Sequence, residues 1–382
     1  MFLKELDIEK KVTNHRKILN SIAEIGMKEF KTSKYIKDYL KQINVEYEEF
    51  LDTAVVGVIK GKIGKKTIAF RADMDGLNID GHVKHLCGHD GHMSILLGLI
   101  EYLNANKENL NENVVFIFQP AEESPGGALP LIKEGVLEKY KVNEIYGLHI
   151  YPEISEGVVG VRPKHFLAQT GEVDIEITGK SGHGAMPENA VDSIVIASNF
   201  INTIQSIISR NIRPLDEAVL TIGKIEGGSR RNVIAEKVIL QGTIRAFKEE
   251  VYKKVKERLT QIAKGFEESF DCKIKIKIKD DYPAVYNDEN LFEEMKKAIG
   301  DENIQILEPL MISEDFSYYQ KQIPGLFFML GSRNEQKGFV NGLHNINFDF
   351  DNTVLLNGIY IYIKILIHKG VLSDHNEKNY KI

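Results

Sequence analysis

Cysteine is scarce in this chain, which has only Cys87 and Cys272 among its 382 residues. The two could form one disulfide, but the N-terminus alternates charged and apolar residues and lacks the uninterrupted apolar core of a signal peptide. We therefore expect a cytoplasmic protein, in which a reducing environment keeps both thiols free. Cys87 is then available as a metal ligand or a nucleophile.

Two further absences exclude classes of partner. The formal net charge is −6, and the adjacent pair Arg230–Arg231 is too small to form a basic patch, so nucleic acid is not an expected partner. No segment approaches eighteen uncharged apolar residues, so no membrane-spanning helix is expected. The hydrophobic content of 43% and charged content of 27% are those of an ordinary globular protein.

The length and the order of patterns predict two domains, because one hydrophobic core rarely grows to 382 residues. Residues 1–167 alternate short apolar runs with amphipathic segments, which is typical of an α/β domain with a largely parallel sheet. Residues 168–281 read as β-α-β-β-α-β, the ferredoxin-like order, and the helix–strand pattern returns over 282–382. We therefore predict one α/β domain interrupted by an inserted, smaller α+β domain.

Potential metal ligands follow several of the predicted strands of the α/β domain. Ligands of open α/β sheets bind outside the carboxyl ends of the strands, where residues far apart in sequence converge. The side chains concerned are Asp73 and Asp75 after TIAFRADMD, Glu122 and Glu123 after NVVFIFQPAEE, His149 at the end of EIYGLH, and His344 in the loop after PGLFFMLG. Their joint occurrence predicts a catalytic metal site rather than a chance arrangement.

The stretch VKHLCGHDGH, residues 83–92, adds a concentrated set of ligands. Cys87 and His89 are two residues apart, so in an extended segment their side chains point the same way. We expect Asp90 to cap the helix that follows, and the N-terminus of that helix to lower the pKa of the Cys87 thiol. Thiolate, imidazole and carboxylate groups together suit Zn²⁺ or a similar divalent ion. His92 is expected either to support a ligand or to pack in the core.

Several blocks of the sequence resemble the motifs of a known enzyme family. They are, in chain order, RADMDGL, HLCGHDGHM, FIFQPAEESPGGA, GLHIYP, GKSGHGAMP, GGSRRNVIAE, GTIRAF, SEDFSYY and GLHNINFDFD. In this order they resemble the amidohydrolase branch of the M20 metallopeptidase family, and the likeness extends over residues 14–367. That branch includes hippurate hydrolases, N-acyl-amino-acid amidohydrolases and N-acetyldiaminopimelate deacetylases.

The resemblance implies a two-metal, exopeptidase-like α/β catalytic domain with an inserted ferredoxin-like lid, through which the chain forms a homodimer. The metal ligands it implies are Cys87, His89, Glu123, His149 and His344, and the general base is Glu122. Asp73 and Asp75 stand at the acidic motif that orients a ligand imidazole, and the resemblance does not say which of them does so. His183 is implied to reach the active site of the partner subunit, and Asn232 and Arg245 to hold the carboxylate of the substrate.

The function expected from the resemblance is metal-dependent hydrolysis of a small N-acyl amino acid, with N-acetyldiaminopimelate among the candidates. Zinc, manganese, cobalt or nickel could occupy the two sites, because availability often decides between them. A dipeptidase or carboxypeptidase with the same site, and a non-catalytic binding protein on the same fold, remain alternatives. One departure concerns the loop between Asp75 and Cys87, where GLNIDGHVKHL replaces the family's longer loop. The width of the entrance to the site therefore does not follow from the resemblance.

Overall fold

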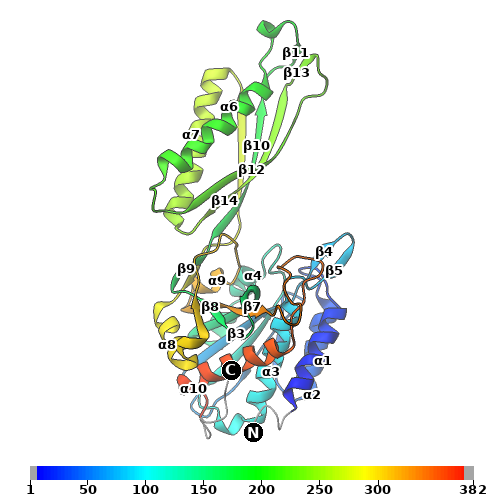
Figure 1. Ribbon diagram of the computed structural model, residues 1–382, viewed down its shortest axis with the longest axis vertical. Helices are drawn as coiled ribbons and strands as arrows, with labels where there is room; N and C mark the ends of the chain where they lie inside the picture. Colours follow the sequence, from blue (N-terminus) through cyan, green and yellow to red (C-terminus); the bar gives the residue numbers. More distant parts are fainter. Residues whose placement is uncertain (1–6, 374–382) are drawn as a thin grey trace. The chain divides into compact units, whose positions relative to one another are not determined.

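The computed structural model describes residues 7–373, which form two compact units (Figure 1). Within this range, unit 1 consists of residues 7–164, 286–308 and 315–373, and unit 2 of residues 165–285 and 309–314, so unit 2 is inserted into unit 1. Both cysteines are free and buried. Over the described part of the chain, no helix combines the length and apolar character needed to span a membrane.

An eight-stranded mixed sheet forms the centre of unit 1. Its order is β1-β2-β6-β3-β7-β18-β8-β17. The strands are β1 (Tyr47–Phe50), β2 (Ala54–Ile59), β3 (Thr67–Asp73), β6 (Asn113–Gln119), β7 (Glu144–Ser155), β8 (Val159–Val161), β17 (Ile304–Ile306) and β18 (Gly325–Arg333). β3 pairs in parallel with β6 and β7, and β18 pairs in parallel with β7. β2 pairs antiparallel with β6, and β8 pairs antiparallel with β18. The central strands are therefore parallel, as the sequence predicted, with antiparallel strands on either side.

The central strands are apolar because both faces of the sheet are covered. All seven residues of β3 are buried. Successive residues of a strand point to opposite faces. Phe70 of β3 and Tyr146 of β7 stack on each other, and the Phe70 ring also contacts Tyr362 of a helix. On the other face, a Cβ at Gly147 would lie 2.8 Å from the ring of Phe316, so this glycine gives room to the aromatic ring. A continuous apolar run is the expected result of burial on both sides.

The helices of unit 1 surround this sheet. They are α1 (Ile8–Ser21), α2 (Phe30–Gln42), α3 (His89–Ala105), α4 (Ala128–Lys133), α5 (Val136–Tyr140), α8 (Glu289–Ile299), α9 (Ser317–Gln320) and α10 (Thr353–His368). α3 is buried almost throughout, since it contacts β3, α1 and α10. Gly98 of α3 and Gly358 of α10 allow close approach: a Cβ on either would lie 2.4 Å or 2.7 Å from an isoleucine of the other helix. The helix that carries His89 is thus held rigidly.

Unit 2 has the ferredoxin-like order that the sequence predicted. Its elements are β10 (Gln169–Thr178), α6 (Ser193–Ser206), β12 (Ala218–Gly227), β14 (Lys237–Ala246), α7 (Glu249–Phe270) and β15 (Lys273–Asp280). They form an antiparallel sheet in the order β12-β14-β10-β15, and α6 and α7 pack on it over an apolar core. A two-stranded ribbon, β11 (Gly182–His183) with β13 (Val233–Ile234), also belongs to this unit.

Four shorter strands lie outside these sheets and the ribbon. β4 (Leu77–Ile79) and β5 (His82–Lys84) form an antiparallel hairpin in the short loop before Cys87. β9 (Lys164–Leu167) and β16 (Val285–Asn287) occur in the sequence where the chain passes from one unit to the other.

Candidate metal centre and active site

The strand ends of unit 1 bring the candidate ligands together. β3 ends at Asp73 and β6 ends beside it at Gln119, because these two residues are register partners in the parallel pair. The sequence predicted that the strand of His149 ends at this residue. That prediction was wrong, because β7 continues to Ser155. His149 nevertheless lies level with the end of β3. Arg71 of β3 pairs with Gly147 of β7, and Asp73 and His149 each lie two residues further along their strands.

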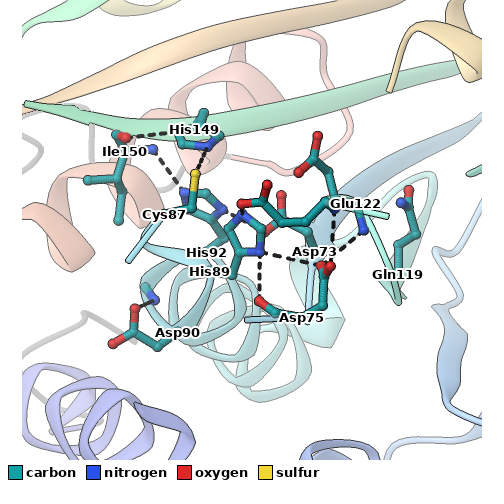
Figure 2. A network of polar contacts seen from close by, with 12 residues as sticks. Asp73, Asp75, Cys87, His89, Asp90, His92, Gln119, Glu122, His149 and Ile150 are labelled. Carbon is teal, nitrogen blue, oxygen red and sulfur yellow. Dashed lines mark hydrogen bonds and ion pairs between the residues drawn. The ribbon is translucent and has the colours of Figure 1, made fainter. Parts of the chain in front are cut away.

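Five potential ligand side chains converge at this edge. The Cys87 Sγ lies 3.4 Å from His149 Nε2 and 3.3 Å from His344 Nε2. The Glu123 Oε1 lies 3.5 Å from His344 Nε2 and 3.9 Å from His89 Nε2. Figure 2 shows three of them pointing toward one another: Cys87 from the loop before α3, His89 from the start of α3, and His149 from β7. The structure thus places the five residues implied as ligands around one small volume.

Two of these imidazoles are oriented by the nitrogen that faces away from the cluster. His89 Nδ1 donates to the carbonyl of Asp75 at 2.9 Å, and His149 Nδ1 donates to the carbonyl of Ile150 at 2.8 Å (Figure 2). With Nδ1 donating in both rings, Nε2 is the nitrogen that faces the shared volume. Fixing the tautomer through the outer nitrogen is how proteins present imidazole to a metal.

The two aspartates of RADMD have different partners. Asp73 accepts from His92 Nδ1 and from Arg71 Nη1, both at 2.7 Å. The Asp75 carboxylate accepts from the backbone N–H of Glu122 at 2.9 Å and of Glu123 at 3.1 Å. Asp75 therefore fixes the loop that carries the implied base and one implied ligand.

His92 supports the cluster and has no nitrogen left to bind a metal. Its Nδ1 donates to Asp73, and its Nε2 accepts from the backbone N–H of Ile150 at 2.9 Å. Asp73 in turn lies 3.7 Å from His89 Nδ1. Of the two expectations for His92, support rather than packing alone is correct, because it links α3, β3 and β7 behind the ligands.

The electrostatics of the cluster fit a bound cation. Burial lowers the pKa of His89, but the carboxylate of Asp73 and the hydrogen bond and charge of Asp75 outweigh it and raise the pKa to about 10. An imidazole that is only 1% exposed holds a proton this tightly only where the surroundings are strongly negative. Within the described residues, His89 Nε2 and Glu123 Oε1 are buried and make no hydrogen bond. Atoms so placed fit a divalent metal, which would supply the missing contacts and neutralise the carboxylates.

Two expectations about this stretch were wrong. Asp90 does not cap α3: Gly88 occupies the N-cap position, and Asp90 lies inside the first turn, where it accepts from Gly91 N and from Asn20 Nδ2. The pKa of the Cys87 thiol is raised well above its usual value rather than lowered. Burial is the main cause, and the nearby carboxylates of Glu123 and Glu122 add to it, so only a metal would favour the thiolate here.

Comparison with known proteins identifies the family. Residues 69–368 match the family described as Peptidase family M20/M25/M40. The chain belongs to this peptidase family. It is 42% identical over 346 residues to the N-acetyldiaminopimelate deacetylase of Bacillus cytotoxicus, a match that covers 86% of this chain and 90% of the relative.

Two solved structures extend the likeness to the fold. One is a candidate aminohydrolase from methicillin-resistant Staphylococcus aureus, with a TM-score of 0.89, 31% identity, and coverage of 97% of this chain and 98% of that one. The other is the Bacillus subtilis YXEP protein, described as a dinuclear metal binding peptidase of the M20 family, with a TM-score of 0.81, 27% identity, and coverage of 95% and 99%. This M20 protein is therefore a metal-dependent amidohydrolase, and the likeness and the ligand clusters support two metal ions.

The remaining predicted residues of this M20 protein lie in unit 2. His183 and Asn232 are neighbours across the β11–β13 ribbon, since His183 pairs with Val233 and the carbonyl of Asn232 accepts from Gly184 N at 2.9 Å. His183 is exposed, and its Nδ1 accepts from Ala185 N at 3.1 Å. Arg245 lies on β14, where its guanidinium bonds the Thr243 hydroxyl and the carbonyl of Ile244.

A buried polar network that lies behind the cluster was not predicted from the sequence. Arg71 donates to Asp73, to Gln119 Oε1 at 2.9 Å, and to Asp315 Oδ1 at 2.7 Å, although its side chain is only 1% exposed. Burial raises the pKa of Asp315, and Arg71 opposes that effect. A signal was available: RAD places a cation inside an otherwise apolar strand, and a buried charge needs a partner of opposite sign.

Proposed function

We propose that this M20 protein hydrolyses the amide bond of small N-acyl L-amino acids and releases the free amino acid and a carboxylate. N-acetyldiaminopimelate is the first candidate substrate, because a relative 42% identical bears the name N-acetyldiaminopimelate deacetylase. The carboxyl-edge cluster carries the proposal, since it combines five side chains of metal-ligating types with a neighbouring carboxylate, Glu122, that is only 7% exposed. The reaction is proposed to take place in the cytoplasm.

In this proposal Cys87, His89, Glu123, His149 and His344 hold the two metal ions. Cys87 Sγ lies between His149 and His344, and Glu123 lies between His89 and His344, so each acidic side chain is shared by two imidazoles. Zinc, manganese, cobalt and nickel all accept such a mixture of sulfur, nitrogen and oxygen ligands. When bound, the metal pair lowers the pKa of a water molecule and polarises the carbonyl of the scissile amide.

Glu122 is the proposed general base and acid. It takes a proton from the attacking water and returns it to the departing amine nitrogen. Its backbone is fixed by the 2.9 Å bond from Glu122 N to Asp75, so its carboxylate starts from a defined position. Such positioning matters because a misplacement of about 1 Å can cost roughly 100-fold in rate.

Unit 2 is proposed to serve as the lid and to make the contact of a homodimer. Since His183 Nδ1 accepts a hydrogen bond from Ala185 N, its Nε2 carries the hydrogen and can donate to the oxyanion in the partner's active site. Arg245 can grip the carboxylate of the substrate with two parallel hydrogen bonds, and Asn232 assists it. These contacts would select substrates with a free α-carboxylate.

The test measures amine release from N-acetyl amino acids, N-acetyldiaminopimelate, hippurate and dipeptides. The protein is stripped with a chelator and reloaded with Mn²⁺, Zn²⁺, Co²⁺ or Ni²⁺, and Glu122→Gln is assayed beside it. Metal-dependent turnover of an N-acyl amino acid that disappears in the variant would support the proposal. Preferred cleavage of dipeptides would contradict the proposal and show that the protein is a peptidase. Metal binding without any turnover would favour a non-catalytic binding protein.

The role of His183 has its own test in mixed dimers. A Glu122→Gln subunit and a His183→Ala subunit are each expected to be inactive as homodimers. If His183 acts across the dimer, mixing them restores one complete site per heterodimer, and about a quarter to a half of the wild-type activity should return. No recovery on mixing, with heterodimers demonstrated, would show that His183 does not act in the partner's site.

A further inference from the structure

The loop that carries Glu122 and Glu123 is held at three consecutive backbone N–H groups by two buried carboxylates. Asp75 binds the N–H groups of Glu122 and Glu123. The preceding N–H, that of Ala121, donates to Glu29 Oε1 at 2.9 Å. Asp75 belongs to the motif next to the cluster, whereas Glu29 lies more than ninety residues before the loop and outside every motif identified in the sequence.

Glu29 is built into its position. It is 0% exposed and is the N-cap residue of α2, where its carbonyl accepts from Ser33 N at 2.8 Å. Its Oε1 also accepts from Met27 N at 3.0 Å, and its Oε2 accepts from the Thr53 hydroxyl at 3.0 Å. The carboxylate therefore joins the start of α2 and the loop before β2 to the loop after β6.

The backbone of Ala121 needs this restraint. Its φ is +57°, in the left-handed region that residues other than glycine rarely adopt. Its carbonyl accepts from Gly126 N at 2.9 Å, which closes the loop, and its N–H is bound by Glu29. Unfavourable backbone conformations persist where the surrounding structure over-determines them.

The same N-terminal segment contacts both strand-end loops of the site. The carbonyl of Glu24 accepts from Gly76 N at 2.8 Å, directly after Asp75. A Cβ at Gly26 would lie 2.3 Å from the carbonyl oxygen of Ser124, so the segment packs closely on the loop after β6. Residues 24–29 thus brace the loop of Asp75 through Glu24 and the loop of Glu122 through Glu29.

We infer that Glu29 is a positioning residue for the reaction. It acts by fixing the Ala121 N–H, and hence the direction in which the side chains of Glu122 and Glu123 project from the loop. This inference rests on the proposed function for its kinetic consequence. Its structural consequence, a loop held closed at Ala121, does not depend on any substrate.

The variants are chosen to separate positioning from general stabilisation. Glu29→Ala removes the acceptor, and Glu29→Met removes it while filling a similar volume, which avoids the cavity that could unfold the alanine variant. Glu29→Gln keeps Oε1 for both backbone N–H groups and can donate to Thr53 through its amide. Thr53→Val is the matched control, because it removes a buried hydrogen bond from the same carboxylate without touching the loop.

The first readout is hydrogen exchange of the amides of residues 121–123 in metal-free protein, which involves no turnover. Exchange should accelerate at least about tenfold in Glu29→Ala or Glu29→Met, and stay within about threefold of wild type in Glu29→Gln and Thr53→Val. The second is steady-state kinetics with saturating metal. The expected loss is about 10- to 100-fold in kcat with KM within about threefold for the acceptor-free variants, and near-normal kcat for the other two.

The outcomes separate this inference from the proposed function. Unchanged exchange and kcat in a folded acceptor-free variant would overturn the positioning role, and so would an equal loss of kcat in Thr53→Val. If wild-type protein hydrolyses no N-acyl amino acid, the proposed function fails, while the exchange measurement still decides whether Glu29 holds the loop.

Discussion

The buried charge of Glu29 makes a quantitative prediction about stability. Burial raises the pKa of Glu29 to about 7 from its usual 4.5, and the nearby carboxylate of Asp75 adds to this effect. The folded protein therefore holds a proton on Glu29 at pH values where the unfolded chain has released it. The contribution of Glu29 to the free energy of unfolding is therefore fully present below pH 4.5 and is lost as the pH rises through 7. At high pH the folded protein carries an unfavourable buried charge.

Replacing Glu29 with glutamine removes the charge but retains an acceptor for the two backbone N–H groups. The difference between the usual pKa of 4.5 and the raised pKa of about 7 corresponds to about 3 kcal/mol of unfolding free energy. Most of it, about 2–3 kcal/mol, develops between pH 5 and pH 8.5. We expect the free energy of unfolding of Glu29→Gln, relative to wild type, to rise by this amount over that interval. The other titrating groups are common to both proteins and largely cancel in the difference.

The assay is urea unfolding of metal-free protein followed by circular dichroism, since the chain has no tryptophan to serve as a fluorescent probe. Unfolding curves are recorded for both proteins at half-unit steps from pH 5 to pH 8.5. A difference in unfolding free energy that does not change with pH would refute the reasoning. So would a difference that moves in favour of wild type as the pH rises, because the buried carboxylate would then be the preferred form.

Three other perturbations have defined outcomes. Arg71→Met should lower the unfolding free energy by about 3–5 kcal/mol in urea titrations, because it leaves the buried carboxylates of Asp73 and Asp315 without their arginine partner; a cost under 1 kcal/mol would contradict this. Gly127→Ala should lower the melting temperature, since its Cβ would lie 1.9 Å from the carbonyl oxygen of Pro120. By contrast, the Cβ of Gly265→Ala in α7 would meet nothing within 4 Å, and this variant should raise the free energy of unfolding by about 0.5–1 kcal/mol. Saturating metal at about 1,000 times its Kd should stabilise wild type by about 4 kcal/mol and Cys87→Ser by clearly less; equal metal-induced shifts in thermal denaturation would remove Cys87 from the ligand set.

The elements of the fold were largely predictable because burial leaves a periodic pattern in the sequence. The runs TIAFRAD, NVVFIFQ and GLFFMLG became β3, β6 and β18, and alternation in KIKIKIK became β15. The order of unit 2 followed from the order of its patterns. A strand's end leaves no comparable signal when the pattern simply continues, so β7 was predicted to stop at His149 and in fact runs on to Ser155.

The implied ligands came from motifs, but the groups that hold them did not. Arg71 and Glu29 act through contacts with residues distant in sequence, and a single charged residue in a sequence does not reveal its partner. The pKa of Cys87 was expected to respond to a helix end, whereas burial and neighbouring carboxylates, which depend on the folded arrangement, determine its direction. Local chemistry was readable, and the environment that modifies it required the structure.

The strand order of unit 1 has a consequence for synthesis of the chain. β18 lies between β7 and β8 in the sheet, although its residues, 325–333, come more than 160 residues after β8. The ribosome therefore completes all of the ferredoxin-like insertion before the central sheet can close, and His344 emerges later still. We expect the insertion to fold first, as a nearly contiguous segment, while the first 164 residues wait with β7 unpaired on one side. During that interval we expect an apolar strand edge to be exposed and open to pairing with another chain.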